Sequence, residues 1–242
     1  MLGLSVATVG LAVYAGYHTM APRSQLYGKT YIGNGGKRRE MALTFDDGPN
    51  DPYTLQLLDV LSKYNVKATF FLIGNYVDQR PDIVRDIVTA GHEVGNHTYT
   101  HPNLIFKSQA ELREEIGRCE LALNNAVGEK HAALFRPPFG ARRPAVLRTV
   151  RKSGLEPIMW SVTGYDWSAK SSEEIERKVT KQVRGGDVVL LHDGGHVAFG
   201  TDRSHTVNAT VKLIEKYKGE GWAMKTVGEM MGKSLKKREH RE

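Results

Sequence analysis

The 242-residue sequence contains a single cysteine, Cys119. One cysteine excludes an internal disulfide, so a hydrophobic core must hold the fold together. Cys119 lies in a stretch of helical pattern beside Leu121 and Leu123, which predicts a small buried residue rather than a reactive thiol. With 40% hydrophobic residues, the chain is long enough to form one sizeable domain.

The middle of the chain carries almost no net charge, although the whole sequence has a net charge of +7. Three positive charges come from Lys37, Arg38 and Arg39, and residues 232–242 form a basic tail. A near-neutral centre without interleaved aromatic and basic residues argues against a nucleic-acid partner. Solvated ends are the simpler explanation of the flanking charge, and contact with an anionic membrane or wall polymer is the alternative.

The first 17 residues contain no Lys, Arg, Asp or Glu. We interpret residues 1–17 as a hydrophobic signal peptide or membrane anchor, followed by a linker over residues 18–40. The hydrophobic segment is shorter than the roughly 20 residues of a spanning helix, and no basic residues precede it, so cleavage and retention both stay open. A buried N-terminal helix is the alternative. Export predicts a protein outside the cytoplasm, secreted or membrane-anchored at the cell envelope.

Strand-like and helix-like segments alternate over residues 41–231, which predicts a parallel α/β domain. Seven such units fit either an open doubly wound sheet or an incomplete barrel. The strands are expected at residues 41–46, 68–73, 92–96, 132–136, 157–161, 187–192 and 222–226. The helices are expected at residues 53–64, 81–90, 108–127, 144–153, 172–184 and 206–218.

The first strand ends abruptly in two adjacent carboxylates, Asp46 and Asp47, followed by Gly48 and Pro49. Adjacent residues of an extended chain point to opposite sides, so both acids can face one cavity only if the backbone bends there. A solvated turn that caps the next helix is the simpler alternative.

Polar residues also stand at or just after the ends of later strands: His97, Arg136, Asp166 and His192. In a barrel these carboxyl ends converge on one face, where active sites are built. An open sheet would instead spread them along one edge.

Two histidines four residues apart, His97 and His101, would meet on one face of a helical turn. Together with Asp47 they form a set of two imidazoles and one carboxylate. Such a set leaves coordination positions free for water and substrate, as catalytic metal sites do. His192 and His196 have the same spacing, but the two glycines between them make regular helix doubtful, so this pair ranks lower.

Five stretches, taken in order, resemble the signatures of the polysaccharide deacetylase family, the NodB-type deacetylases of carbohydrate esterase family 4. The resemblance runs from about Met41 to about Met231 and implies the family's distorted (β/α)7 TIM-like barrel. The five stretches are Thr44-Phe45-Asp46-Asp47-Gly48-Pro49, Asn96-His97-Thr98-Tyr99-Thr100-His101-Pro102, Phe135-Arg136-Pro137-Pro138-Phe139-Gly140, Trp160-Ser161-Val162-Thr163-Gly164-Tyr165-Asp166-Trp167 and Leu190-Leu191-His192-Asp193.

The resemblance implies that Asp47, His97 and His101 bind one divalent metal ion. Zinc is our first choice, and the ligand types also permit cobalt or nickel. Asp46 is then the base that takes a proton from the attacking water, and Arg136 pairs with Asp46.

The later motifs imply the acid and the substrate pocket. Asp166 would orient His192, and a histidine held by a carboxylate has a raised pKa that suits a proton donor. Trp167 and Leu190 would form walls of the acetyl pocket.

The turn after the fourth strand departs from the family pattern at one position. Phe139 stands where the family commonly has Tyr, so it retains the backbone N–H that would help to hold an oxyanion and loses only a hydroxyl. Pro138, beside it, is assigned to substrate contact. Subsite contacts are therefore more affected by the departure than catalysis is.

These features predict a metal-dependent N-deacetylase acting on N-acetylglucosamine-containing polysaccharide or oligosaccharide, of the peptidoglycan or chitin type. The same site could hydrolyse O-acetyl esters, for instance on xylan. A catalytically inactive glycan-binding wall protein is the alternative from another class, and the presence of acid, base, ligands and arginine argues against it. We expect a monomer whose partner is the glycan; an uncleaved N-terminal segment would in addition attach the protein to a membrane.

Overall fold

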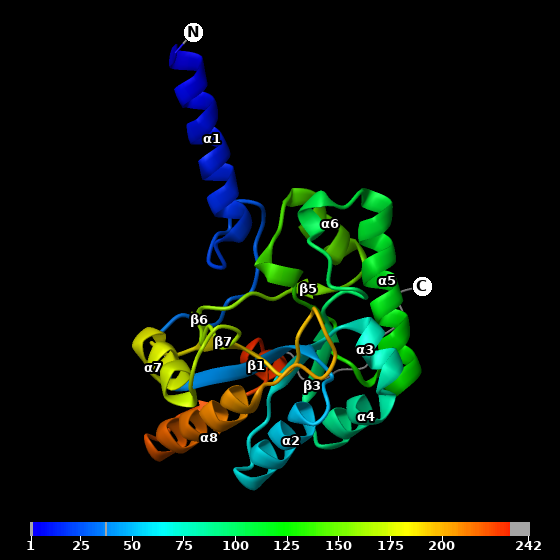
Figure 1. Ribbon diagram of the computed structural model, residues 1–242, viewed down its shortest axis with the longest axis vertical. Helices are drawn as coiled ribbons and strands as arrows, with labels where there is room; N and C mark the ends of the chain where they lie inside the picture. The colour runs from blue at the N-terminus through cyan, green and yellow to red at the C-terminus, as the bar shows by residue number, and fades with distance from the viewer. Residues whose placement is uncertain (1, 37, 233–242) are drawn as a thin grey trace.

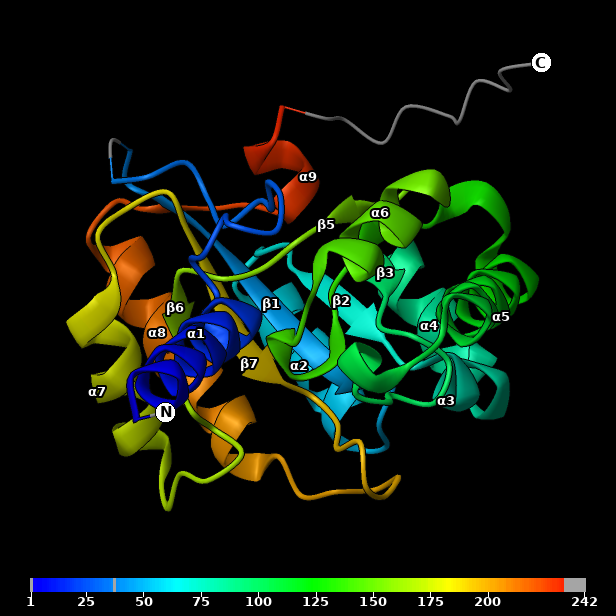
Figure 2. The same cartoon turned by 90° about the horizontal axis from the view of Figure 1, so that it is seen from above.

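The computed structural model of the protein describes residues 2–36 and 38–232, so residues 233–242 of the predicted basic tail lie outside the described residues. Within those residues, parallel strands form one curved sheet with helices packed around it (Figures 1 and 2). The strands are β1 (Glu40–Gly48), β2 (Thr69–Leu72), β3 (Glu93–Asn96), β4 (Leu134–Phe135), β5 (Glu156–Pro157), β6 (Val162–Thr163), β7 (Asp187–His192) and β8 (Ala223–Met224).

The strand order is β5-β4-β3-β2-β1-β7-β6, and β8 pairs with the start of β1. Since β5 and β6 belong to one continuous segment, residues 156–163, this segment closes the sheet into a distorted barrel. The structure therefore confirms the barrel rather than the open sheet.

The single strand expected at residues 157–161 is wrong. Pro157 has no N–H to donate. The Ile158 N–H still donates to the carbonyl of Phe135 in β4 at 2.8 Å, and after Ile158 the backbone changes partners. The Met159 N–H donates to the carbonyl of Tyr31 at 2.8 Å, and the Ser161 N–H donates to the carbonyl of Val188 at 3.0 Å. The closing segment is thus bonded partly to residues from the N-terminal region.

Six of the helices lie where the sequence predicts them, with ends that differ by one or two residues. Residues 74–80, for which the sequence predicts no helix, are mostly helix α3 (Gly74–Gln79), whose residues Tyr76 and Val77 are buried. A helix of this length is too short to show a clear period in the sequence.

The helices are α1 (Leu2–Met20), α2 (Tyr53–Lys63), α3 (Gly74–Gln79), α4 (Pro81–Thr89), α5 (Gln109–Val127), α6 (Pro144–Lys152), α7 (Ser172–Gln182), α8 (Ser204–Gly219) and α9 (Val227–Met230), with 3-10 turns at Leu104–Phe106, Gly128–Lys130 and Pro138–Gly140.

The alternation of side chains along β1 divides the core into two layers. Phe45 belongs to the outer cluster that packs between sheet and helices, and it stacks on Phe70 with ring centroids 5.1 Å apart. Such a pair contributes about 0.5–1.5 kcal/mol beyond the area that it buries. Ala42, on the opposite side of the strand, belongs to the inner cluster. Cys119 is fully buried in the outer cluster, as predicted.

Helix α9 closes the barrel at the amino-terminal ends of its strands. A carboxylate oxygen of Glu93 accepts hydrogen bonds from the Gly228 N–H at 2.9 Å and from the Thr69 hydroxyl at 3.0 Å. The Thr69 hydroxyl in turn accepts from the Val227 N–H at 3.0 Å. This buried network fills one end of the barrel and leaves the opposite end for a site.

The N-terminal helix α1 projects away from the barrel (Figure 1). None of the helices in the described part of the chain is both long and apolar enough to cross a membrane. Where α1 joins the domain, the buried Arg142 donates to the carbonyls of Ala21 at 2.5 Å and Ser24 at 2.9 Å. The Arg142 N–H also donates to the carbonyl of Thr19 at 3.1 Å. The start of the segment predicted as a linker is therefore fixed against the barrel.

Candidate active site

Asp47 is the extra residue of a β-bulge. In the pairing of β1 with β2, Asp46 lies opposite Phe71 and Gly48 lies opposite Leu72, so Asp47 is skipped. Its φ of 73° is in the left-handed region, which is uncommon for residues other than glycine. Bulges of this kind redirect a side chain beside an active site. This is the bend that two adjacent acids require in order to face one cavity.

Two glycines allow the ends of β1 and β7 to approach closely. A Cβ atom on Gly48 would lie 2.1 Å from the Asp193 carboxylate, and a Cβ on Gly194 would lie 2.0 Å from the Asp47 carbonyl oxygen. Any side chain at either position would push the two strand ends apart and displace Asp47.

His97 and His101 lie on an irregular turn after β3, so the expected helical turn is wrong. The φ angle is 68° at Thr98 and 57° at His101, both left-handed. Glu115 of α5 accepts hydrogen bonds from the backbone N–H groups of residues 99 and 100, at 3.0 and 2.9 Å. This distant carboxylate fixes the turn and brings the two imidazole ring centroids to 4.9 Å.

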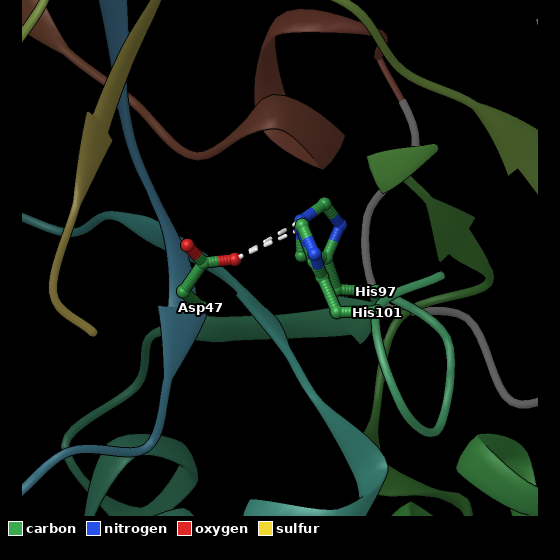
Figure 3. A group of neighbouring side chains, drawn as sticks. All are labelled: Asp47, His97 and His101. Carbon is green, nitrogen blue, oxygen red and sulfur yellow. Dashed lines mark ion pairs between the residues drawn. The ribbon is translucent and has the colours of Figure 1, made fainter. Parts of the chain in front are cut away.

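Asp47 points from β1 towards both imidazoles (Figure 3). Its Oδ1 lies 3.2 Å from Nε2 of His101 and 3.4 Å from Nε2 of His97, and all three residues are buried. Among the described residues, neither Asp47 Oδ1 nor His101 Nδ1 has a hydrogen-bond partner. A buried carboxylate oxygen left in this way is costly unless an ion compensates it. The donor set suits zinc and related ions, so this group could hold a metal ion.

The pKa values of Asp47 and His101 also suit metal binding. Burial raises the pKa of Asp47, but the three imidazoles around its carboxylate, those of His196, His97 and His101, outweigh burial and hold that pKa well below its usual range. Burial, with the neighbouring His97, lowers the pKa of His101 to about 3. An ionised carboxylate and a neutral imidazole are the forms that bind metals.

Asp46 forms a buried ion pair with Arg136. Nη1 of Arg136 donates to Oδ1 of Asp46 at 2.6 Å and to the Thr44 hydroxyl at 2.8 Å. The other carboxylate oxygen of Asp46 lies 3.8 Å from Nε2 of His97, whereas Oδ1 of Asp47 lies 3.4 Å from the same nitrogen. Asp46 therefore lies beside the group that could hold a metal ion, which in the described part of the chain consists of Asp47, His97 and His101.

His192, at the end of β7, is held by Asp166. Nδ1 of His192 lies 2.8 Å from Oδ1 of Asp166, and the other oxygen of Asp166 accepts from the His192 backbone N–H at 2.7 Å and the Thr206 hydroxyl at 2.8 Å. Burial lowers the pKa of His192, but the charge and hydrogen bond of Asp166 outweigh burial and raise it to about 9. His192 thus keeps a proton at neutral pH.

The residues assigned to substrate contact lie at different depths. Phe139 and Trp167 are exposed, whereas Pro138 and Leu190 are buried. The Trp167 ring meets the His192 ring edge to face, with centroids 5.3 Å apart. Phe139 has a left-handed φ of 58°, which turns the chain sharply after the prolines. An aromatic rim therefore borders the proposed acid.

Three residues that support the site are not among the site residues predicted from the sequence, and two of them, Glu115 and Thr206, carry no recognisable signal there. Glu115 lies within an ordinary helical pattern, and Thr206 is one of many threonines. His196 has a signal, the second four-residue histidine spacing, but that spacing suggests a rival ligand pair with His192. In the structure His192 is bound to Asp166, while His196 stacks on the ring of His101.

We expect Asp166→Asn to lower the pKa of His192 in the metal-free protein, because the amide removes the charge that raises it. The folded-state pKa of about 9 exceeds the unfolded value of about 6.5. The interaction therefore stabilises the fold fully below about pH 6.5 and is lost as the pH rises through about 9. NMR titration of His192 measures the shift. An unchanged pKa in the variant would show that Asp166 does not control this histidine.

Comparisons with known proteins agree with this geometry. Residues 33–158 match the family model described as polysaccharide deacetylase. A peptidoglycan-N-acetylglucosamine deacetylase from Bacillus cereus is 39% identical over 193 residues, which cover 79% of this chain and 87% of the relative. A chitooligosaccharide deacetylase from Bradyrhizobium sp. (strain ANU 289) is 40% identical over 190 residues, which cover 76% of this chain and 87% of the relative.

A solved structure shares the fold. The crystal structure of the Bc1960 peptidoglycan N-acetylglucosamine deacetylase in complex with 4-naphthalen-1-yl-N-oxidanyl-benzamide superposes with a TM-score of 0.78 at 35% sequence identity. The match covers 86% of this chain and 94% of that structure. The chain therefore belongs to the polysaccharide deacetylase family, and the protein is a deacetylase.

Proposed function

We propose that the protein is a metal-dependent hydrolase that removes N-acetyl groups from N-acetylglucosamine-containing polysaccharide or oligosaccharide. The observation that carries this proposal is the convergence, at one end of the barrel, of a metal-binding group, a buried carboxylate and a carboxylate-held histidine. The relatives named for peptidoglycan and for chitooligosaccharide support a glycan of one of these two types.

Asp47, His97 and His101 would hold one divalent ion. We propose zinc, and the donor set also accepts cobalt or nickel. When bound, such an ion polarises the substrate's acyl oxygen and lowers the pKa of water at the site.

Asp46 is the proposed base. Arg136 holds its Oδ1 at 2.6 Å, which leaves the other oxygen, on the side of His97, to accept a proton from the attacking water. A base fixed in this way needs no reorientation during the reaction. The fully buried guanidinium of Arg136 also balances the charge of Asp46.

His192 is the proposed acid. Because its Nδ1 is bound to Asp166, Nε2 is the atom that can deliver a proton to the departing sugar nitrogen. An amine leaves poorly without that proton, so His192 completes cleavage of the C–N bond. The products are acetate and a free amino sugar.

The remaining residues are proposed to shape the substrate pocket. The backbone N–H of Phe139 would help to stabilise the oxyanion of the tetrahedral intermediate. Trp167 and Leu190 would wall the acetyl group, and Pro138 would contact the substrate while it fixes the turn. The edge contact of Trp167 with His192 supports this placement.

We propose that the enzyme acts outside the cytoplasm at the cell envelope. Residues 1–17 would serve as export signal or membrane anchor, residues 18–40 would connect it to the catalytic domain at 41–231, and residues 232–242 would form a basic tail. A relative named for peptidoglycan, an envelope polymer, supports this location. A monomer suffices, since one chain supplies every proposed catalytic group.

Acetate release by the purified protein from chitin oligosaccharides, peptidoglycan and acetylated xylan tests the proposal. We expect release from an N-acetylated glycan at a higher rate than from xylan. Release from xylan alone would make the protein an O-acetyl esterase. No release from any of the three, despite stoichiometric metal, would favour a glycan-binding wall protein.

A further inference from the structure

A fourth imidazole, that of His196, lies beside the proposed metal site. Its side chain is 40% exposed, and its Nδ1 lies 3.7 Å from Oδ2 of Asp47. The ring stacks on that of His101, with centroids 4.5 Å apart and planes inclined by only 25°. Phe139 meets both rings edge to face, at 4.6 Å from His101 and 5.1 Å from His196.

The loop that carries His196, residues 194–203, is fixed by contacts that do not involve the His196 side chain. Three side chains outside or at the end of the loop bond to its backbone. The side-chain amide of Asn50 donates to the carbonyl of Thr201 and accepts from the N–H of Gly200, both at 2.9 Å. The guanidinium of Arg203 donates to the carbonyl of Gly194 at 2.6 Å, and the hydroxyl of Tyr76 donates to the carbonyl of Gly195 at 3.1 Å. We therefore expect the loop to keep its position when residue 196 is changed.

The two oxygens of Asp47 have different surroundings. Oδ1 faces the imidazoles of His97 and His101, while Oδ2 faces His196. The distance to His196 exceeds a normal hydrogen bond by about 0.5 Å, so a small ring movement would close it. Carboxylate ligands of metal sites are in turn hydrogen-bonded by neighbouring groups that orient them. His196 is placed to do this for Asp47.

The stacked geometry disfavours a direct ligand role for His196. An imidazole binds a metal ion through a lone pair in the plane of its ring. Because the rings of His101 and His196 are stacked nearly parallel, the in-plane lone pairs of their nitrogens do not converge on one point. Among the residues that the structure describes, the donor atoms close enough to share an ion belong to Asp47, His97 and His101.

We propose that His196 is a positioning residue for the metal ligands: its ring nitrogen holds Oδ2 of Asp47, and its face supports His101. The proposal rests on the proposed metal site and is independent of which glycan is cleaved. It adds a residue from the loop after β7 to a site otherwise built from β1 and the turn after β3.

Two substitutions separate the two contacts. His196→Phe keeps an aromatic face against His101 but removes the nitrogen, whereas His196→Gln keeps a hydrogen-bond donor and removes the ring. His205→Ala, at an exposed histidine on α8, is the matched control. Zinc and cobalt affinities of the full chain are measured by competition with a chromogenic chelator. We expect His196→Phe to weaken binding about 10-fold or more, His196→Gln to weaken it less, and His205→Ala to leave it unchanged.

The visible absorption bands of the cobalt-saturated proteins identify the ligands themselves. We expect His196→Phe to keep the wild-type bands, since its ligands are the same. Altered bands would make His196 a ligand and overturn the positioning role. Wild-type affinity in His196→Phe would also overturn it, while leaving the metal site intact. If the wild-type protein bound neither ion, the proposed metal site itself would fail.

Discussion

Asp46→Asn is expected to lower the kcat of acetate release by about 10²–10⁴-fold, the usual contribution of a general base. The amide has nearly the same size and still offers an oxygen to Arg136, which donates to Oδ1 at 2.6 Å. The asparagine side chain cannot act as a base, so it cannot take a proton from the attacking water. Because Asp46 lies outside the group of metal donors, the variant should still bind one ion.

Asp47→Asn is the matched control, since the neighbouring residue is the proposed ligand. We expect it to lose metal affinity, whereas Asp46→Asn retains it. Steady-state acetate release and metal content, measured on both proteins, distinguish the two roles. Full turnover by Asp46→Asn would remove Asp46 as the base, and loss of metal from that variant would make it a ligand.

Arg136→Met is expected to destabilise the fold by about 3–5 kcal/mol, because it leaves the carboxylate of Asp46 buried without its partner. Arg136 is 0% exposed and Asp46 is 3% exposed, so water cannot replace the lost contact. Combining Arg136→Met with Asp46→Asn should recover much of the loss, since the double variant no longer buries an unpaired charge.

Denaturant unfolding of the two single variants and the double variant measures this coupling. Arg80→Met is the control, because Arg80 pairs with Asp82 at 2.8 Å in a more exposed position. Exposed pairs contribute about 0–1 kcal/mol. A loss in Arg136→Met no larger than that in Arg80→Met would be incompatible with a buried ion pair at Asp46.

The sequence predicts best the strand whose bounds are marked by its own residues, β7. The apolar run before His192 is bounded by polar residues, so the bounds of β7, Asp187–His192, agree with the prediction. The segment 156–163 was predicted less well because its partners change along its length. One of those partners, Tyr31, belongs to a region without strand-like pattern, so no local signal could reveal it.

In the candidate site, too, local sequence signals predict some features, and contacts between residues far apart in sequence decide the others. Position at strand ends was enough to bring Asp46, Asp47 and Arg136 together as candidates. The bulge at Asp47 depends on how β1 pairs with β2, and the turn that holds His101 depends on Glu115 from α5. These are contacts between residues far apart in sequence. Spacing alone therefore predicted that the histidines meet but gave the wrong local structure for the turn.

The metal dependence of the enzyme is tested by acetate release from an N-acetylglucosamine oligosaccharide by chelator-treated protein, before and after zinc is added back. We expect no release from the treated protein and recovery of the original rate when about one zinc ion is bound per chain. Release at the original rate from protein shown to be free of metal would contradict this metal dependence.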